Sequence, residues 1–406
     1  MSAWLSVIGI GEDGMDGLSG AGRALVEAAE LLVGGERHLA LAPAGAAERL
    51  LWRQPLGDTM ALIAARRGRR VVVLASGDPL CYGVAAMLAR HFPAEEMRVL
   101  PQPGAFSLAA ARLLWPLADC VTVSLHGRPI EALRLHLAPG ARILALTSDG
   151  ATPMQAARLL REASWGRSVL TVFEHLGGPQ ERRIDAVAES WKQETVAALN
   201  TLAIDCRAGP DARPLSRLAG LPDDAFAHDG QLTKRAVRAA TLAALAPLSG
   251  ELLWDIGAGC GSIAIEWLRA SRSLRAIAIE RDAARCALIA QNAAALGVPE
   301  LRVVQAAAPE ALAGLPTPDA IFLGGGVGDG ALFEAAWRAL RPGGRLVANA
   351  VTLEGEAQLL RRQREWGGDL VRIAVSHAEP IGTRQGWRPL MPVTQLAVTK
   401  PRERAP

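Results

Sequence analysis

The sequence predicts an α/β protein built from two consecutive domains, and three observations lead to this prediction. Short apolar runs alternate with amphipathic helical stretches, the order that produces parallel sheets covered by helices. Several of the apolar runs end in glycine-rich loops, most clearly at residues 255–261. At 406 residues the chain is also longer than one compact domain usually is.

The composition excludes several classes of protein. Half of the residues are hydrophobic and 21% are charged, as in globular proteins. A net charge of +3 and a single tyrosine argue against a nucleic-acid surface. No apolar run approaches the roughly 18 residues of a membrane span, and the N-terminus does not resemble a signal peptide. Five cysteines without a C-x-x-C pair favour the reduced cytoplasm, and no cluster has metal-ligand spacing.

The first half contains two strands that run into glycine loops. A strand at residues 5–10 overlaps the Gly9-Ile-Gly11 turn, and an amphipathic helix is predicted at residues 18–32. A second strand at residues 70–75 ends in Ser76-Gly-Asp-Pro79. Open α/β sheets place ligands at the carboxyl ends of their strands, so these loops are candidate binding elements.

Three further stretches give the first half its family resemblance. They are Pro103-Gly-Ala-Phe-Ser107, the strand and loop Val121-Thr-Val-Ser-Leu-His-Gly-Arg128, and Val172-Phe-Glu-His-Leu-Gly-Gly-Pro. In this order they resemble the tetrapyrrole methylases over about residues 1–200, most closely the branch that methylates carbon 5 of precorrin-6Y. The resemblance implies two α/β lobes that bind S-adenosylmethionine (SAM) through Gly9, Gly11, Gly77, Asp78 and Ser107.

The first half also departs from that family. Many relatives have Pro-Gly after the first Gly-x-Gly, where this chain has Glu12-Asp13-Gly14. Many have Ser-Ser near the helix, where this chain has Phe106-Ser107.

Residues 205–224 interrupt the alternating pattern. They hold three prolines and two glycines without periodicity, which predicts an ordered linker or a strand-edge extension. We therefore expect a first domain at residues 1–204, a linker at 205–222 and a second domain at 223–406, with the boundary near Gly220.

The second half is organised around residues 252–266. A short strand at 252–254 leads through Asp255 into glycines at alternate positions, and a helical pattern follows at 263–268. Missing side chains let the backbone approach a ligand, and the helix start presents free N–H groups. The spacing G-x-G-x-G differs from the dinucleotide fingerprint G-x-G-x-x-G and resembles motif I of the Rossmann-like SAM methyltransferases. A strand at 276–279 ends in Glu280, an acid that can hold ribose hydroxyls.

The remaining second half predicts a mainly parallel, doubly wound sheet. Strands are expected at residues 302–306 and 319–323, a turn at 340–344 leads into a further strand ending at Asn349, and residues 370–375 and 394–398 form a closing antiparallel hairpin. Thr233 is placed to cap the first helix of this domain.

Five segments in this order resemble the carbon-15 precorrin methyltransferases with decarboxylating activity. They are Asp229-Gly-Gln-Leu-Thr-Lys234, the glycine loop, Ala308-Pro-Glu-Ala-Leu, the triple glycine from Gly324, and Pro389-Leu-Met-Pro-Val. Where relatives have Gly-Asp before Ala308, this chain has alanines, so backbone groups must contact the adenine. The cofactor residues implied here are Thr233, Asp255, Gly257, Ala258, Gly259, Cys260, Gly261, Glu280, Ala308 and Gly324.

The fusion of the two halves resembles the precorrin-6Y C5,15-methyltransferases (decarboxylating). This resemblance implies a bifunctional enzyme of cobalamin biosynthesis with two SAM sites, one in each half. It would methylate carbons 5 and 15 of precorrin-6Y and decarboxylate the C12 acetate to give precorrin-8X. Candidate catalytic groups are His126, Arg128 and Lys234, with Arg235, Arg384 and Arg388 as further carboxylate-binding candidates. The expected partners are the tetrapyrrole and further copies of the chain in a homo-oligomer, with no nucleic acid and no membrane.

Three alternatives remain open from the residues alone. An RNA methyltransferase would have a basic face or an N-P-P-Y-type segment where this chain has Leu323-Gly-Gly-Gly326. An NAD-dependent oxidoreductase conflicts with the glycine spacing and with the absence of a Tyr-x-x-x-Lys pair. A nonenzymatic regulator would need only one of its glycine sites to be occupied. Calorimetry with SAM, NADH and RNA separates them.

Overall fold

The computed structural model describes residues 3–402, which fold as two compact units. One unit holds Met1–Ile130 with Ala138–Arg213, and the other holds Glu131–Leu137 with Pro214–Pro406. The division after Arg213 lies inside the segment predicted as a linker. Within residues 3–402, no helix has both the length and the apolar character that a bilayer span requires.

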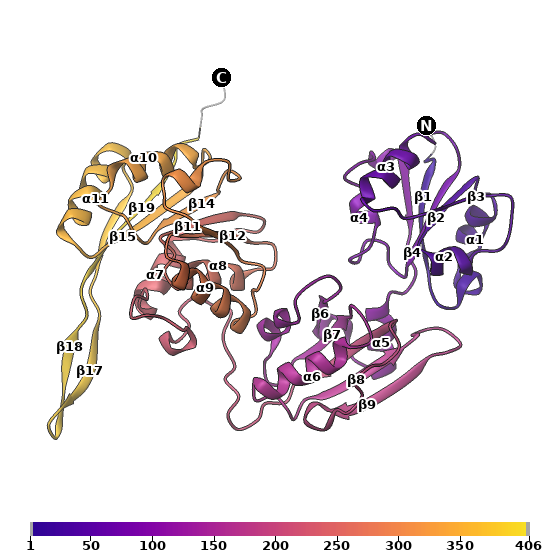
Figure 1. The fold of residues 1–406 in the computed structure, drawn as a ribbon, viewed down its shortest axis with the longest axis horizontal. Coiled ribbons are helices and arrows are strands. Elements are labelled where there is room, and N and C mark those ends of the chain that lie inside the picture. Colours follow the sequence, from indigo (N-terminus) through magenta and orange to yellow (C-terminus); the bar gives the residue numbers. More distant parts are fainter. Residues whose placement is uncertain (1–2, 403–406) are drawn as a thin grey trace. The chain divides into compact units, whose positions relative to one another are not determined.

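The first unit begins with a lobe built on a parallel five-stranded sheet of order β3-β2-β4-β1-β5 (Figure 1). Its strands are β1 (Leu5–Ile10), β2 (Leu31–Gly34), β3 (Glu48–Leu51), β4 (Val71–Ser76) and β5 (Met97–Leu100). Helices α1 (Gly20–Glu27) and α2 (Glu36–Leu41) cover one face, and α3 (Leu56–Ala64) and α4 (Ala85–Leu88) cover the other. Two separate apolar clusters result, one on each face of the sheet.

The prediction of one helix over residues 18–32 is wrong. Helix α1 ends at Glu27, and Leu31 already begins β2, which lies between β3 and β4. Leu31, Leu32 and Val33 are all buried because a central parallel strand is covered on both faces. Such a strand is apolar at every position, so some of its residues also fell at positions that continue the apolar pattern of α1.

The second lobe of this unit has a mixed sheet of order β6-β7-β10-β8-β9, in which only β6 and β7 are parallel. Its strands are β6 (Cys120–Ser124), β7 (Arg142–Leu146), β8 (Val169–Glu174), β9 (Arg182–Val187) and β10 (Asn200–Asp205). Helix α5 (Ala105–Leu113) packs on β7 and β10, and α6 (Thr152–Glu162) packs on β8. The two α/β lobes expected for this half are confirmed.

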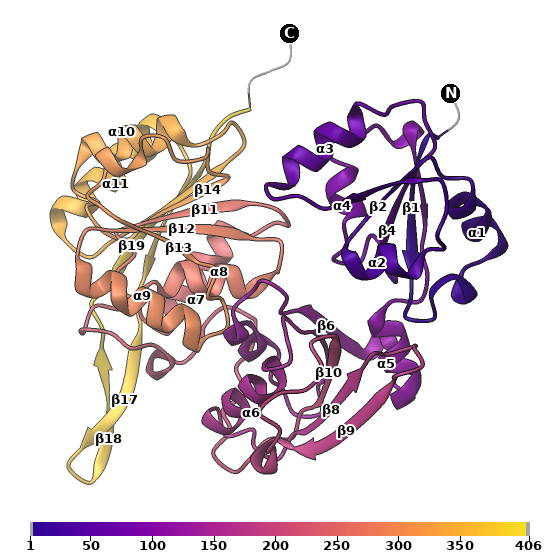
Figure 2. The same ribbon diagram turned by 45° about the vertical axis from the view of Figure 1, so that its right-hand side comes forward.

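The second unit is a doubly wound sheet of order β13-β12-β11-β14-β15-β19-β16, as predicted. Its strands are β11 (Leu252–Ile256), β12 (Arg275–Glu280), β13 (Arg302–Gln305), β14 (Ala320–Leu323), β15 (Arg345–Ala350), β16 (Asp369–Ile373) and β19 (Val393–Thr399). Helices α7 (Arg235–Leu245), α8 (Ser262–Ala270) and α9 (Ala283–Ala295) cover one face, and α10 (Gly330–Ala339) and α11 (Leu353–Trp366) cover the other (Figure 2). The strand order reverses next to β11, where such folds bind their ligands.

Two details of the second unit differ from the sequence prediction. The predicted closing strands do pair, as β16 with β19, but a separate hairpin of β17 (Ser376–Ile381) and β18 (Arg384–Pro389) is inserted between them. It extends away from the main sheet as an arm (Figures 1 and 2). Thr233 does not cap α7, because Lys234 occupies the N-cap position and no side chain caps that helix.

Short 3₁₀ helices complete the described chain. They lie at Gly14–Gly17, Ala94–Glu96, Leu117–Asp119, Ile130–His136, Ala188–Ser190, Asp223–Ala225 and Glu310–Leu312.

A buried ion pair fixes the start of the second unit. Arg238 on α7 is fully buried, and its Nε donates to Glu266 Oε1 on α8 at 2.6 Å. The other Glu266 oxygen accepts the N–H of Gly220 at 2.6 Å. Arg238 also donates to the carbonyls of Leu221 and Thr233. One charged pair therefore holds the incoming chain, the segment before α7 and two helices together.

We expect Glu266→Ala to destabilise the second unit by roughly 3–5 kcal/mol, because it leaves a buried guanidinium without its main partner. Denaturant unfolding of the full chain measures this change. The control is Glu379→Ala in the exposed pair with Arg388, where side-chain exposures of 46% and 74% limit the effect to about 1 kcal/mol. Equal effects of the two changes would contradict the prediction.

Candidate functional site

The second unit has a cavity of about 910 Å³ along the carboxyl ends of its parallel strands. Binding sites for small molecules commonly range from about 300 to 1,000 Å³, so this volume is in range for a cofactor together with part of a substrate. Most of the residues predicted for this half line it: Thr233, Lys234, Gly257, Ala258, Gly259, Cys260, Glu280, Ala308 and Gly324. Asp255 and Gly261, at the start and end of the loop, do not line it.

The glycine loop is held close to the backbone of the neighbouring strand loop. Gly257 has φ +70°, and a Cβ there would lie 2.7 Å from the Gly325 amide nitrogen. Gly261 has φ +82°, and its Cβ would lie 2.9 Å from Ile289 on α9. These positions need glycine for packing and conformation. Gly259, at φ +61°, faces open space instead, with only Gln231 O within 4 Å of a Cβ.

Glu280 links the second strand to the glycine loop. It is 5% exposed and lines the cavity. Its Oε2 accepts the N–H of Gly259 at 2.9 Å, and its Oε1 accepts the N–H of Asp282 at 3.1 Å. Each carboxylate oxygen keeps a further lone pair, so the side chain can still accept from a vicinal diol in the cavity.

Cys260 is a packing residue in this loop. Its side chain is 3% exposed, and burial raises the pKa of its thiol. The backbone carbonyl of Cys260 accepts from Asn292 Nδ2 at 2.9 Å, which ties the loop to α9.

Sequence reasoning missed several residues that line the same cavity. Gln231 lies inside the Asp229–Lys234 motif, and Arg281 directly follows Glu280. Asn349 is the penultimate residue of β15, close to the carboxyl end where such sheets bind ligands. Val375, Leu390 and Met391 come from the ends of the β17–β18 arm; Leu390 and Met391 lie inside the Pro389-Leu-Met-Pro-Val segment, whereas no sequence pattern marks Val375.

The first unit has a smaller cavity, of about 80 Å³, between its two lobes. Gly11 and Gly77 line it, whereas Gly9, Asp78 and Ser107 do not. A Cβ on Gly9 would lie 1.7 Å from Gly77 O, so this glycine permits two loops to touch. Asp78 uses Oδ1 to accept the N–H of Leu80 at 2.9 Å within its own turn.

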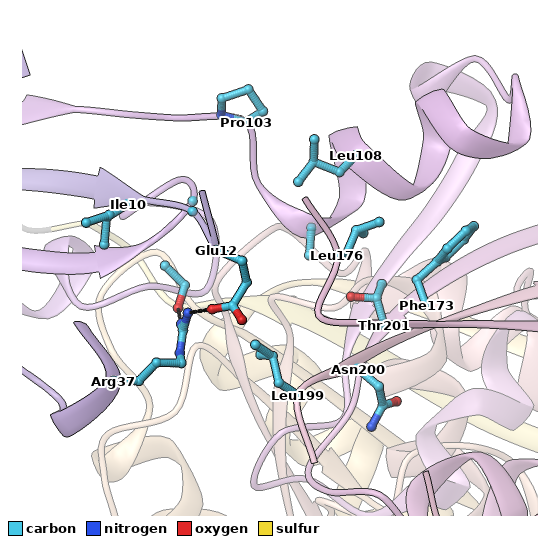
Figure 3. A pocket seen from close by; sticks show the side chains of 14 residues that line it. Ile10, Glu12, Arg37, Pro103, Leu108, Phe173, Leu176, Leu199, Asn200 and Thr201 are labelled. Atoms are coloured by element: carbon cyan, nitrogen blue, oxygen red, sulfur yellow. Dashed lines mark hydrogen bonds and ion pairs between the residues drawn. The ribbon is translucent and has the colours of Figure 1, made fainter. Parts of the chain in front are cut away.

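Two charged side chains, Glu12 and Arg37, line this first cavity among mainly apolar and small residues (Figure 3). Glu12 pairs with Arg37, and its other oxygen lies 3.2 Å from His175 Nδ1 on the second lobe. Arg37 Nη2 also donates to Ser76 Oγ at 2.7 Å. Burial, with the Arg37 charge, lowers the pKa of neighbouring His38 to about 4, so that ring is neutral near pH 7. Glu12, the departure noted in the sequence, thus connects the two lobes.

The structure does not bring His126 and Arg128 into either cavity. Both are exposed in the loop after β6. The Arg128 guanidinium carbon lies 5.5 Å from the centroid of the Tyr82 ring. Arg384 and Arg388 are also exposed, on the β17–β18 arm. Of the three predicted catalytic groups, only Lys234 lines a cavity.

The second cavity suits a cofactor with a ribose and a cationic centre. It presents an acid, a glycine loop and backbone groups at the topological switch point. Within residues 3–402, no three His, Cys, Asp or Glu side chains are grouped to hold a metal ion.

Asp255 is a buried acid at the start of the glycine loop. Its Oδ2 accepts the N–H of Ala264 at 3.0 Å, whereas Oδ1 has no hydrogen-bond partner. Burial raises the pKa of this carboxyl to about 7; the Ala264 N–H lowers it and the Glu280 charge raises it. At pH 5 the folded chain therefore keeps a proton that the unfolded chain, with a pKa of about 3.9, releases.

Protonation of Asp255 in the folded chain therefore adds to the free energy of unfolding at low pH. This contribution is lost as the pH rises through about 7. We expect Asp255→Asn to remove roughly 3 kcal/mol of the decline in unfolding free energy between pH 5 and pH 8. Denaturant unfolding of both proteins at the two pH values measures this difference. Parallel pH profiles for the wild type and the variant would contradict it.

Comparisons with known proteins cover both halves of the chain. A family model described as Tetrapyrrole (Corrin/Porphyrin) Methylases matches residues 5–191, and one described as Precorrin methyltransferase domain matches residues 224–400. A precorrin-6Y C(5,15)-methyltransferase [decarboxylating] of Sinorhizobium sp is 52% identical over 98% of this chain and 97% of its own length.

Two Salmonella typhimurium proteins each match about half of the chain. A cobalt-precorrin-7 C(5)-methyltransferase is 32% identical over 48% of this chain and 98% of its own length. A cobalt-precorrin-6B C(15)-methyltransferase (decarboxylating) is 34% identical over 42% of this chain and 89% of its own length. Because identity above half extends over nearly the whole length of the Sinorhizobium relative, this chain belongs to the family of precorrin-6Y C(5,15)-methyltransferases (decarboxylating).

Proposed function

We propose that this SAM-dependent methyltransferase and decarboxylase of cobalamin biosynthesis divides its reactions between two SAM sites. The first unit would methylate carbon 5, and the cavity of the second unit would methylate carbon 15 and decarboxylate the acetate. The observation that carries the proposal is the large cavity bounded by Glu280 and the glycine loop. An RNA substrate is not favoured, because both family models that match are precorrin or tetrapyrrole methylases.

Residue roles in the second site follow from the positions around the cavity. Glu280 would accept from the ribose hydroxyls, and the backbone at Gly257–Gly259 and Ala308 would contact the rest of the cofactor. Lys234 and Arg281 line the cavity as cations suited to substrate carboxylates. SAM supplies an electrophilic methyl group, so the protein contributes mainly orientation.

The first site needs a local rearrangement to bind SAM. Its cavity of about 80 Å³ is well below the range of roughly 300–1,000 Å³ for ligand sites, and the Glu12–Arg37 pair projects into it. Separation of this pair would enlarge the space between Gly11, Gly77 and the β10 residues Asn200 and Thr201.

Three further proposals concern the domain limits, the oligomeric state and the location of the protein. Domain limits at 1–204, 205–222 and 223–406 are supported by the ranges of the family models and by the division of the chain after Arg213, while Glu131–Leu137 groups with the second unit. A homo-oligomer is supported by the β17–β18 arm, whose strands pair only with each other among the described residues. A cytoplasmic location is supported by five free cysteines.

We expect Glu280→Gln to weaken SAM binding at the second site by roughly 1–3 kcal/mol. The variant keeps the size of the side chain but loses the charge that strengthens bonds to ribose hydroxyls and to the Gly259 N–H. Isothermal titration resolves this site when the first one is disabled by Gly11→Val. Unchanged affinity for SAM would contradict the proposed role of Glu280 in binding the cofactor.

A pair of glycine variants tests the division of labour. Gly259→Val adds bulk at a position where only Gln231 O lies within 4 Å of a Cβ, and the φ of +61° also strains an L residue there, so we expect loss of carbon-15 methylation and of carbon dioxide release. Gly11→Val adds bulk in the first site, where the three atoms nearest to a Cβ all belong to Asp13 and its Oδ1 is 2.6 Å away, and it should abolish carbon-5 methylation. SAM stoichiometry should fall from two to one in each variant.

Mass spectrometry of products, with substrate and SAM supplied, counts methyl groups added and carbon dioxide lost. A wild-type stoichiometry of one, or full decarboxylation by Gly259→Val, would refute the assignment.

A further inference from the structure

The lining of the second cavity comes from segments of different chemistry. The glycine loop, Glu280 and Ala306–Ala308 present backbone groups and one acid. Lys234, Arg281 and Arg285 add cations. From the last residues of β15 onward, the lining residues are Val351, Val375, Leu390, Met391, Val393 and a single polar one, Asn349. If the glycine loop and Glu280 hold SAM, these mainly apolar residues are left for the tetrapyrrole.

The Asn349 amide is anchored by two buried neighbours. Asn349 on β15 and Gln395 on β19 are directly paired across the sheet. Gln395 Nε2 donates to Asn349 Oδ1 at 2.8 Å and to Thr241 Oγ1 at 3.0 Å. Asn349 Nδ2 donates to the same Thr241 oxygen at 2.9 Å. Thr241 and Gln395 are 0% and 3% exposed, so this network is shielded from water.

The number of hydrogens on these groups determines the orientation of the Asn349 amide. A threonine hydroxyl has one hydrogen, and Thr241 donates it to Val237 O at 2.8 Å. The Thr241 oxygen must therefore accept, so both amides turn an N–H toward it. Asn349 Oδ1 then faces Gln395. One N–H of Asn349 is left over, and Asn349 lines the cavity.

We propose that this remaining N–H of Asn349 binds the carboxylate of the substrate acetate that is lost, a role that rests on the proposed function of the second site. A neutral amide orients the carboxylate without neutralising it. In an apolar surrounding, a poorly solvated carboxylate is raised in free energy relative to a transition state whose charge spreads over the macrocycle. A lysine or arginine at this position would stabilise the carboxylate and oppose the loss of carbon dioxide.

The step balances without an added redox partner. The bond between the acetate methylene and its carboxyl carbon breaks, and carbon dioxide leaves. The bonding electron pair passes into the conjugated, electron-poor ring system of the substrate. A proton from water later completes the methyl group on the ring.

The test compares Asn349→Leu and Asn349→Asp in the full-length enzyme with substrate and SAM. Both variants should keep two SAM sites and carbon-5 methylation, while the rate of carbon dioxide release falls roughly 10- to 100-fold. In Asn349→Asp the rate should recover as the pH falls, because the introduced carboxyl then carries an O–H donor; Asn349→Leu should show no recovery. Gln363→Glu on α11 is the matched amide-to-acid control outside the cavity, and its rate should be unchanged.

Thr241→Val tests the anchor separately. The Asn349 N–H remains in this variant, but Thr241 no longer fixes its direction. We therefore expect a smaller loss in the rate of carbon dioxide release than in Asn349→Leu, with unchanged SAM affinity. A wild-type rate in Asn349→Leu, or the same pH profile in both Asn349 variants, would overturn the role of Asn349. If Gly259→Val has lost carbon dioxide release in the same assay, the assignment of the second site still stands.

Discussion

A single buried guanidinium organises the second unit. Arg238 reaches Glu266 on α8, the carbonyl of Leu221 in the incoming chain and the carbonyl of Thr233, which lines the large cavity. Burial of such a charge is costly unless all of its donors are satisfied, so these segments have little freedom to move independently. The position of Thr233 and Lys234 beside the cavity thus depends on an ion pair whose two residues do not line that cavity.

The same fold principle produces two different sites. In both units, parallel strands end in glycine loops at one edge of a sheet, yet the cavities measure about 80 and 910 Å³. The loops after the first strand of each sheet also differ. In the first unit, Glu12 follows Gly11, lines the cavity and contacts Arg37 and His175, whereas the glycine loop of the second unit presents only glycines and small residues.

The sequence could predict features that neighbouring residues determine, but not contacts between residues far apart in the chain. The 252–268 strand, loop and helix, and Glu280 at the end of the next strand, were predictable because spacing along the chain determines them. The contact between Glu12 and His175 spans 163 residues, and the Asn349–Gln395 pair needs the register of β15 on β19. Neither has a signature in a single sequence. Helix α1 was extended too far because a strand buried on both faces has no alternation to reveal it.

Charged groups of both signs surround the large cavity. The acid Glu280 lines it, and Asp255 is buried at the start of the glycine loop. The cations Lys234, Arg281 and Arg285 also line it, whereas Asn349 is the only polar side chain among the lining residues from the last part of β15 onward. A cationic sulfonium is attracted to the acids, and methyl transfer turns it into a neutral thioether that loses this attraction. In the proposed assignment, these cations would bind the other carboxylates of the substrate, while the one that leaves would meet the neutral amide of Asn349. Binding strength and reactivity would then depend on different side chains of the same cavity.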